Sequence, residues 1–514
     1  MTRRVAIAAP GPSAVEAGRA VTAAGGNAVD AAIAAIVVAS CTEPGIVSPM
    51  GGAYVNVWSP TQGPYVVDGN VEMPGRGRES ARFGAGVWEV HMAYGGGTTV
   101  FGGPGSVAVP GMFAALAEAS TRWGRLPWLE LLVPAAHVLR AGYGLGTAAA
   151  YYLQFSRPQL FGQDPQTVAF LRQCGITPTA GALLRDPDLA ATLDHIGRVG
   201  AQDLYTGELG RALAADMDAR GGLVSTEDLA AYRTVTRPAV ACSLGDWELG
   251  VNPPPSIGGP VLAAMIRLLQ ARHAQRGVTD AHDIIDIQRI VLSHRRSHLD
   301  CAEDLTAAGE ELLDLVAALG ADGLAAMSTS PETIHVSAID DDGLACAITT
   351  SAGYGSGVTV PGTGLMLNNA LGEPELNTRG LHALLPGQRL ASNMAPTTGR
   401  RRDGSMLAIG SPGADRITTS IFQVLDALCL RHLPLQEAID APRLHVQLDA
   451  AGEPTVRYER AGELPRAAAD SGLPSLAHEP VTMWFGGVGA TLLHSSGNLE
   501  GAADPRRAAA VGVG

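Results

Sequence analysis

The chain has 514 residues and a formal net charge of −14, with 36 basic residues against 50 acidic ones. All the basic residues are arginines, because the sequence contains no lysine, which excludes Schiff-base lysine chemistry and a Walker-type phosphate loop. The acidic balance argues against nucleic acid or an anionic membrane as a partner. Hydrophobic residues make up 46% of the chain, with 64 glycines and 33 prolines, so we expect a large globular core with many turns.

The six cysteines are scattered singly and form no CxxC pair, at positions 41, 174, 242, 301, 346 and 429. This spacing favours buried reduced thiols over a disulfide frame or a metal site. The apolar run at 5–9 is too short for a signal segment and is followed by Pro10, and no later run reaches the length of a membrane span. The sequence therefore predicts a cytoplasmic protein with no membrane contact, no metal and no cofactor.

The first half of the chain contains a mixture of strand and helix patterns. Residues 28–39 are nearly all small and apolar, which predicts a helix buried on every side. Residues 53–58 and 65–68 read as a strand pair, and the glycine-rich residues 84–110 read as a long ordered loop near a cleft. Residues 111–238 look mainly helical, 240–251 strand-like and 260–327 helical, and the Arg/His cluster at 294–298 is interpreted as a solvated or interdomain face.

Residues 333–351 predict a β-hairpin. Ile334, Val336 and Ala338 alternate with Thr333, His335, Ser337 and Ile339, and an Asp/Gly turn at 341–343 leads into a second apolar arm. A polar run with a proline, 328–332, precedes it and reads as an exposed loop.

Thr333 stands at the head of this hairpin. Cleavage between Glu332 and Thr333 would free an α-amino group able to act as a base toward the threonine hydroxyl. The alternative is a threonine that merely suits a strand.

A strand-turn-helix junction follows near residue 410. The apolar run 406–410 leads into Ser411-Pro412-Gly413-Ala414 and then a predicted helix over 417–431. Backbone N–H groups at such a helix start can bind an oxyanion or a carboxylate, and the alternative is a turn that only connects two elements. Two short strands are expected near 482–484 and 490–493.

Several blocks of the sequence resemble, in order, motifs of the γ-glutamyltranspeptidase family of N-terminal nucleophile hydrolases. The blocks are Gly25-Gly26-Asn27-Ala28-Val29-Asp30-Ala31-Ala32, Gly221-Gly222-Leu223 with Ala230-Ala231-Tyr232, Pro253-Pro254-Pro255-Ser256 with Gly258-Gly259, Gly410-Ser411-Pro412-Gly413, and Asp504-Pro505-Arg506. The resemblance covers the chain from about residue 4 to its end.

This resemblance implies an α+β fold, the four-layer αββα sandwich of these hydrolases. It also implies a precursor that cuts itself before Thr333. The products would be a large part, 1–332, and a small part, 333–514, that stay intertwined and act on a small molecule. A homodimer of this processed unit stays open.

The resemblance also assigns the reaction centre residue by residue. Thr333 falls on the family's nucleophile, and Ser351 falls where the family has a second threonine that hydrogen-bonds the nucleophile. Gly413 and Ala414 fall on the paired glycines whose N–H groups form the oxyanion hole, and alanine keeps that N–H.

The substrate pocket departs from the family pattern. Val71 stands where the family has an arginine that holds the glutamyl α-carboxylate, and Glu373 stands where it has the aspartate that pairs with the α-amino group. Losing an arginine contact to a carboxylate weakens binding by a few kcal/mol. Four further positions are compared with the family's substrate contacts. Gly353 lies near the position of an asparagine that this sequence lacks. Ala391 replaces one of two adjacent serines, Ser392 is the serine that is retained, and Asn393 follows it.

Three hypotheses follow from these observations. The first is an autoprocessing threonine hydrolase that cleaves an amide or related acyl bond of an unusual substrate. The second is a carbon–carbon bond hydrolase in the biosynthesis of 4-alkylproline-type antibiotic building blocks, as implied by relatives of this family. The third is a non-catalytic homologue that stays one chain.

Overall fold

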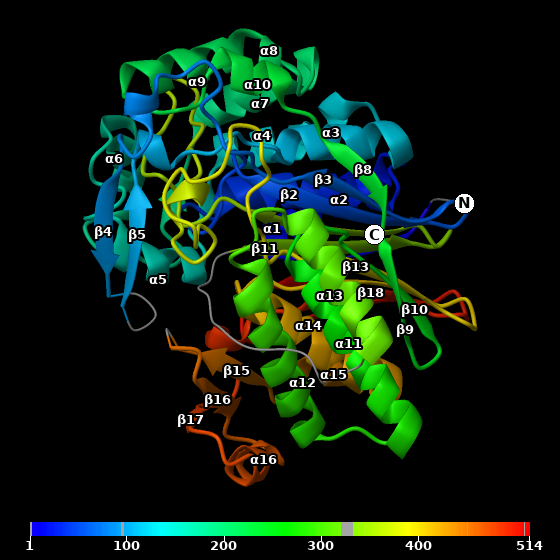
Figure 1. The fold of residues 1–514 in the computed structure, drawn as a ribbon. Coiled ribbons are helices and arrows are strands. Elements are labelled where there is room, and N and C mark those ends of the chain that lie inside the picture. The colour runs from blue at the N-terminus through cyan, green and yellow to red at the C-terminus, as the bar shows by residue number, and fades with distance from the viewer. Residues whose placement is uncertain (1–2, 94–96, 320–332, 450, 508) are drawn as a thin grey trace.

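The computed structural model describes residues 3–93, 97–319, 333–449, 451–507 and 509–514. Two antiparallel sheets lie face to face at the centre of the molecule, and helices cover the outer face of each (Figure 1). The layers therefore run helix, sheet, sheet, helix. Among the described residues, none of the helices is both long enough and apolar enough to cross a membrane.

The first sheet has seven strands, and the ends of the chain meet in it. The strands, in spatial order, are β20 (Ala510–Val513), β1 (Val5–Ala9), β11 (Ile334–Asp340), β12 (Ala345–Ser351), β2 (Gly52–Ser59), β3 (Gly63–Gly69) and β8 (Val235–Pro238). Every pairing in this sheet is antiparallel.

The second sheet has six strands, which also come from distant parts of the chain. In spatial order they are β19 (Leu499–Ala503), β18 (Gly489–Leu493), β14 (Met406–Gly410), β13 (Thr397–Arg401), β10 (Trp247–Val251) and β9 (Val240–Leu244).

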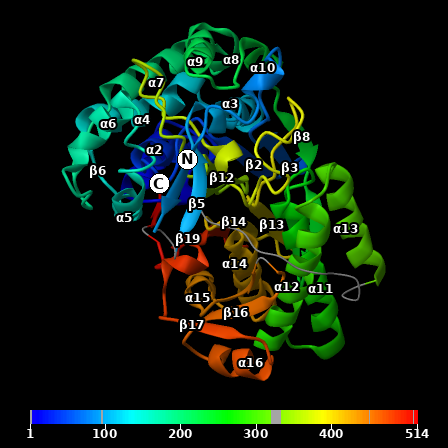
Figure 2. The same ribbon diagram turned by 60° about the vertical axis from the view of Figure 1, so that its left-hand side comes forward.

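The covering helices form two groups, visible on opposite sides of the sheets in Figures 1 and 2. Those over the seven-stranded sheet are α1 (Pro12–Ala23), α2 (Ala28–Thr42), α3 (Met112–Trp123) and α4 (Trp128–Ala141). Those over the six-stranded sheet are α11 (Gly258–Arg276), α12 (Ala281–His294), α13 (Leu305–Leu319) and α14 (Arg416–Leu425).

Smaller elements surround these layers. Between α4 and β8 the chain is mainly helical, as predicted, with α5 (Thr147–Ser156), α6 (Pro165–Leu171), α7 (Pro187–Val199), α8 (Asp203–Thr206), α9 (Glu208–Ala219) and α10 (Thr226–Ala231), and one short strand pair, β6 (Tyr143–Gly144) with β7 (Leu183–Leu184). A three-stranded sheet near the end of the chain contains β15 (Leu444–Leu448), β16 (Pro454–Glu459) and β17 (Ser475–His478), beside α15 (Leu435–Asp440) and α16 (Leu464–Asp470).

The capping residues and apolar composition of helix α2 explain where it begins, where it ends and why it is buried. Asn27 caps its start by accepting hydrogen bonds from the backbone N–H groups of Val29 and Asp30, while the Asp30 carboxylate accepts one from the N–H of Asn27. Every residue of the helix is buried, as its apolar composition predicts. The helix ends at Thr42, with Glu43 as its C-cap, because Pro44 disfavours a helical conformation in the residue before it.

The predicted hairpin at 333–351 is confirmed as β11 and β12. Ile334, Val336 and Ala338 pack into the core under the helices, while Ile339 packs between the sheets with Met406. The two faces of β11 therefore separate as the alternation predicts.

Two expectations for individual segments were wrong, and a third holds only in part. The glycine-rich residues 84–110 contain a hairpin, β4 (Trp88–Met92) with β5 (Thr98–Gly102), because alternating apolar side chains there override the glycines. Residues 483–485 form one turn of 3₁₀ helix instead of a strand. In the cluster at 294–298, Ser297 and His298 are exposed. His294 and Arg295 are buried, and the His294 ring stacks on His298 with centroids 4.1 Å apart, so only part of the cluster is a solvated face.

Candidate active site

Thr333 immediately precedes β11, and only 3% of its surface is exposed. The register pairs Ile334 with Thr350, so one step further along the ladder Ser351 lies opposite Thr333. Directly opposed residues of an antiparallel pair point to the same face. The two hydroxyl-bearing residues that the family pattern singled out are thus neighbours on adjacent strands.

A buried polar row continues along the same face of β11. The His335 ring lies 2.8 Å from the Thr349 hydroxyl through Nδ1 and 2.7 Å from the Ser337 hydroxyl through Nε2. Because Ser337 donates its proton to the carbonyl of Gly489, it accepts from Nε2–H, and Nδ1 accepts from Thr349. Burial lowers the pKa of His335 to about 3, so the ring is neutral at physiological pH.

A pocket opens on the side of Thr333 that faces β12 and contains about 470 Å³ of empty space, including its mouth. We call it the β12-side pocket. Nine residues singled out in the sequence line it: Val71, Thr333, Ser351, Gly353, Glu373, Ala391, Ser392, Asn393 and Ala414. The lining residues that the sequence reasoning missed are Asn70, Ala370, Leu376, Leu390 and Met394.

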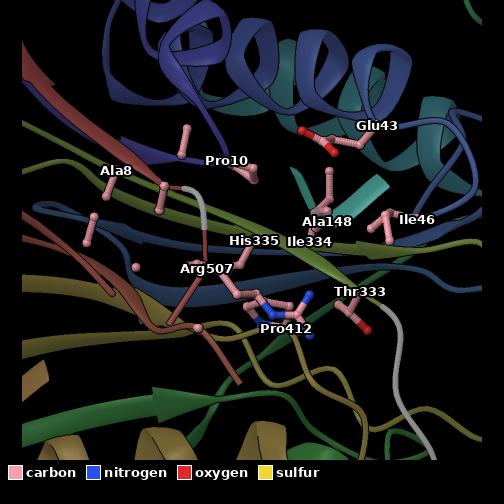
Figure 3. Close-up of a pocket in the computed structure, with 15 residues that line it drawn as sticks. Ala8, Pro10, Glu43, Ile46, Ala148, Thr333, Ile334, His335, Pro412 and Arg507 are labelled. Carbon is pink, nitrogen blue, oxygen red and sulfur yellow. The ribbon is translucent and has the colours of Figure 1, made fainter. Parts of the chain in front are cut away.

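The predicted oxyanion turn lies between β14 and α14. Pro412 lines a second pocket, whose walls also include Thr333 and Glu43 (Figure 3). Ala414 lines the β12-side pocket, and Gly413 stands between Pro412 and Ala414 in the chain. Both residues of the Gly413–Ala414 pair have positive φ, 126° and 53°. A left-handed alanine is uncommon and costs about 1–2 kcal/mol, and such strained backbone clusters at functional sites.

Val71 belongs to a small apolar cluster with Ala370, Leu371 and Leu390. Among the residues that the structure describes, no arginine or histidine lines the β12-side pocket. Arg76 and Arg78, the cations nearest in sequence to Val71, are held elsewhere: Arg76 reaches Asp228 at 3.4 Å, and Arg78 pairs with Asp218 at 2.5 Å.

Glu373 brings a carboxyl group to the β12-side pocket. Its side chain is buried, and burial raises its pKa well above the usual value for a carboxyl, with the charge of Glu375 acting in the same direction. A Cβ placed on Gly353 would lie 2.8 Å from a Glu373 carboxylate oxygen. The carboxyl therefore packs directly against the Gly353 backbone, which has a φ of 60°.

Ser392 and Asn393 add further oxygen acceptors. The Ser392 hydroxyl accepts a hydrogen bond from the N–H of Met394 at 3.3 Å. The Asn393 Oδ1 atom is buried without a hydrogen-bond partner among the described residues. A buried unpaired carbonyl oxygen is costly, and here it belongs to a residue that lines the β12-side pocket.

Glu332, the residue on the other side of the predicted cleavage point, lies outside the described residues. Within the described part of the chain, no group of three or more His, Cys, Asp or Glu side chains is arranged to hold a metal ion.

Comparison with known proteins agrees with this architecture. The model of the gamma-glutamyltranspeptidase family matches residues 14–513. A glutathione hydrolase proenzyme of Pseudomonas aeruginosa is 29% identical over 479 residues, covering 86% of this chain and 83% of that protein. An acylase ACY 1 proenzyme of a Pseudomonas species is 29% identical over 519 residues, covering 96% and 90%.

The fold also matches a solved structure. The crystal structure of cephalosporin acylase from Bacillus halodurans superposes with a TM-score of 0.82 at 24% identity, covering 99% of this chain and 96% of that one. The predicted αββα sandwich is confirmed. The chain belongs to the γ-glutamyltranspeptidase family of N-terminal nucleophile enzymes.

Proposed function

We propose that this enzyme cuts itself before Thr333 and then hydrolyses an amide or related acyl bond through a Thr333 acyl-enzyme. In this proposal the Thr333 hydroxyl attacks the carbonyl carbon, and the freed α-amino group of Thr333 takes the hydroxyl proton and delivers it to the leaving group. The N–H groups of Gly413 and Ala414 stabilise the oxyanion. Water then releases the acyl group. Two similar proteins are named proenzymes, which supports a processed precursor.

The composition of the β12-side pocket carries the substrate part of the proposal. Its lining offers carboxyl, hydroxyl and amide groups from Glu373, Ser392 and Asn393, and the described lining residues include no arginine or histidine. An acyl group with hydrogen-bond donors, such as an amine, suits this lining better than one with a carboxylate. We therefore infer that the acyl half of the substrate lacks the α-carboxylate of a glutamyl group.

Denaturing gel electrophoresis with N-terminal sequencing tests the processing. We expect two fragments, the smaller beginning at Thr333, and we expect the Thr333→Ala chain to stay whole and inactive. Cleavage at another position, or turnover by the Thr333→Ala chain, would contradict the proposal. A wild-type chain that stays whole would instead favour the non-catalytic homologue.

Three matched p-nitroanilides test the acyl preference. The γ-glutamyl compound carries an amine and a carboxylate, the 4-aminobutyryl compound keeps only the amine, and the glutaryl compound keeps only the carboxylate. We expect kcat/KM to be highest for 4-aminobutyryl and lowest for glutaryl. The reverse order would contradict the proposed pocket chemistry. Turnover of a dicarboxylic pathway intermediate with loss of a carbon fragment, and of none of the anilides, would favour the carbon–carbon hydrolase.

A further inference from the structure

A third pocket lies beyond the β12-side pocket. It contains about 960 Å³ of empty space, including its mouth, and we call it the outer pocket. Leu376 and Ala391 line both the outer pocket and the β12-side pocket. These two side chains therefore stand between the space beside Thr333 and the outer pocket. A substrate group that passes them leaves the β12-side pocket and enters the larger space.

Two segments of the chain supply most of the walls of the outer pocket. One lies between residues 376 and 391, and the other, between residues 300 and 306, leads into α13. The Thr378 hydroxyl donates a hydrogen bond to the backbone carbonyl of Asp300, and Arg379 pairs with Glu303 at 3.3 Å. These contacts join the two walls, although the segments are far apart in the sequence.

The partition between the two pockets is held in place on the side of Leu376. The Asn377 Nδ2 atom donates hydrogen bonds to the backbone carbonyls of Ala370 and Glu373 at 2.8 and 2.9 Å. The N–H of Leu376 donates to the same Glu373 carbonyl at 3.1 Å. On the other side of the partition, Ala391 contributes only a methyl group. The small side chain of Ala391 thus narrows the way between the pockets less than the serine of the family pattern would.

Asp300 brings a buried carboxyl group to the wall of the outer pocket. Its side chain is only 9% exposed. The Oδ1 atom accepts a hydrogen bond from Arg295 Nε at 3.0 Å, whereas Oδ2 accepts none from the described residues. Burial raises the pKa of this carboxyl, although the charge of Arg295 opposes the rise. Buried polar atoms are normally hydrogen-bonded, and a ligand in the outer pocket can supply the missing donor.

Both arginines that line the outer pocket are paired with acids. Arg389 pairs with Glu72 at 2.6 Å, and Arg379 pairs with Glu303. Asp304 adds a further carboxylate, whose Oδ1 atom accepts hydrogen bonds from N–H groups in the first turn of α13. The pocket therefore offers carboxylate oxygens to a ligand and keeps its arginines in ion pairs, which favours an amine over a carboxylate.

We propose that the outer pocket binds the far end of the substrate's acyl group, and that this end carries a second amine directed by Asp300. The inference rests on the proposed Thr333 acyl-enzyme and extends it to a class of substrate. The acyl carbonyl lies at Thr333, the first amine lies beside Glu373, and the chain continues past Ala391 to the second amine. The substrate is therefore an amide of a long carboxylic acid that contains two amines.

Extended p-nitroanilides test the proposal within one series. Each is a 4-aminobutyryl p-nitroanilide whose amine nitrogen carries an added chain. The chain is 3-aminopropyl, or butyl of the same length without a charge, or 2-carboxyethyl with the opposite charge. We expect kcat/KM to be at least about tenfold higher for 3-aminopropyl than for butyl, because a charge-assisted hydrogen bond to a buried carboxylate is gained. The carboxyethyl compound should be lowest, and aminoethyl and aminobutyl chains bracket the length.

Variants of the outer pocket identify where the gain arises. Asp300→Asn keeps the shape of the side chain and should remove the preference for 3-aminopropyl over butyl. Because this change leaves the buried Arg295 without its charged partner, a second variant covers a failure to fold. Ala302→Trp fills the outer pocket and should lower kcat/KM for the 3-aminopropyl compound at least about tenfold relative to unextended 4-aminobutyryl. Ala307→Trp, exposed in the first turn of α13 and outside the described lining, is the matched control and should keep the wild-type ratio.

The possible failures are distinguishable. A wild-type chain that neither cuts itself nor hydrolyses any of the anilides contradicts the proposed acyl-enzyme. An enzyme that hydrolyses the 4-aminobutyryl compound, but prefers no aminoalkyl chain over the alkyl chain of the same length, overturns the outer pocket alone. Hydrolysis of the unextended compound without hydrolysis of any extended one also overturns it. A folded Asp300→Asn or Ala302→Trp enzyme that keeps the wild-type ratios has the same consequence.

Discussion

Val71 packs against Ala370 and Leu390 in the wall of the β12-side pocket, where its family relatives are expected to carry an arginine. Its isopropyl group offers no hydrogen bond, while Glu373 and Asn393 in the same pocket offer oxygen atoms. Under the proposed function, Val71 therefore removes the cation that would hold a substrate carboxylate.

Restoring the cation at this residue should move the preference back. We expect Val71→Arg to raise the ratio of kcat/KM for γ-glutamyl over 4-aminobutyryl p-nitroanilide by at least about tenfold, through a charge-assisted contact to the α-carboxylate. Val71→Met, of similar length without charge, is the control and should leave the ratio near its wild-type value. An arginine variant that lowers the ratio would show that the carboxylate does not approach residue 71.

His335 predicts how stability depends on acid. Its folded pKa of about 3 lies below the ordinary value of 6.5, so the unfolded chain binds one more proton between those values. The contribution of His335 is complete above pH 6.5 and is lost as pH falls toward 3, by up to about 1.4 kcal/mol per pH unit. In a Thr333→Ala background, which should keep one chain, His335→Asn should flatten the fall in unfolding free energy between pH 6.5 and 4. Parallel curves for the two proteins would refute this assignment.

Strands β11 and β14 show how closely the two sheets approach. A Cβ on Gly410 of β14 would lie 2.3 Å from the His335 ring, whereas a Cβ on Gly489 of β18 would lie 3.8 Å from the nearest side chains. The first distance is a clash and the second is ordinary contact. Gly410 is therefore required by the packing of two layers.

This difference gives a matched pair of variants. Gly410→Ala should lower the free energy of unfolding by about 1–3 kcal/mol through overpacking, and Gly489→Ala should change it by less than half as much. Urea unfolding of both variants in the Thr333→Ala background measures the effect. Equal destabilisation by the two alanines would mean that the sheets can separate enough to accept a methyl group.

The elements differ in how well the sequence reveals them. Helix α2 and the hairpin of β11 and β12 were predictable because strong apolar periodicity agrees with a cap or a turn at their ends. The hairpin of β4 and β5 was missed because the surrounding glycines suggested a loop. The burial of Arg295 was unpredictable, since it depends on Asp300 five residues later, at 3.0 Å.

Both sheets interleave the proposed large and small parts of the chain. In the seven-stranded sheet, β1 lies between β11 and β20, which come from beyond residue 333. In the six-stranded sheet, β10 pairs with β13 across the same division. The division at 332 and 333 is thus a boundary in the chain and not in the packed structure.

Cleavage should therefore leave the parts associated. We expect both fragments of the 52.9 kDa chain to co-elute in gel filtration under native conditions and to separate only in concentrated guanidinium chloride, because release would break the backbone pairing of β1 on both sides. Fragments that separate in native buffer would contradict the interleaved arrangement.

The site as a whole was predictable only in part. Local pattern identified Thr333 as no more than a strand residue, and the family resemblance brought in Ser351, Gly353 and Ala391 from distant segments. No sequence signal placed Glu43 beside the nucleophile. It stands at the end of a buried helix, where an acid before Pro44 indicates only that the helix stops.

Thr333 lines two pockets, and the chain contains no lysine. These two features together would allow selective labelling of the amine at Thr333. After the proposed cleavage, the only primary amines would be the one at the start of the chain and the one on the nucleophile itself. An amine-reactive dye would then read processing as the gain of a single label. A compound bound in either pocket would protect that amine from the dye. Reduced labelling would therefore measure ligand binding and could be used for ligand screening.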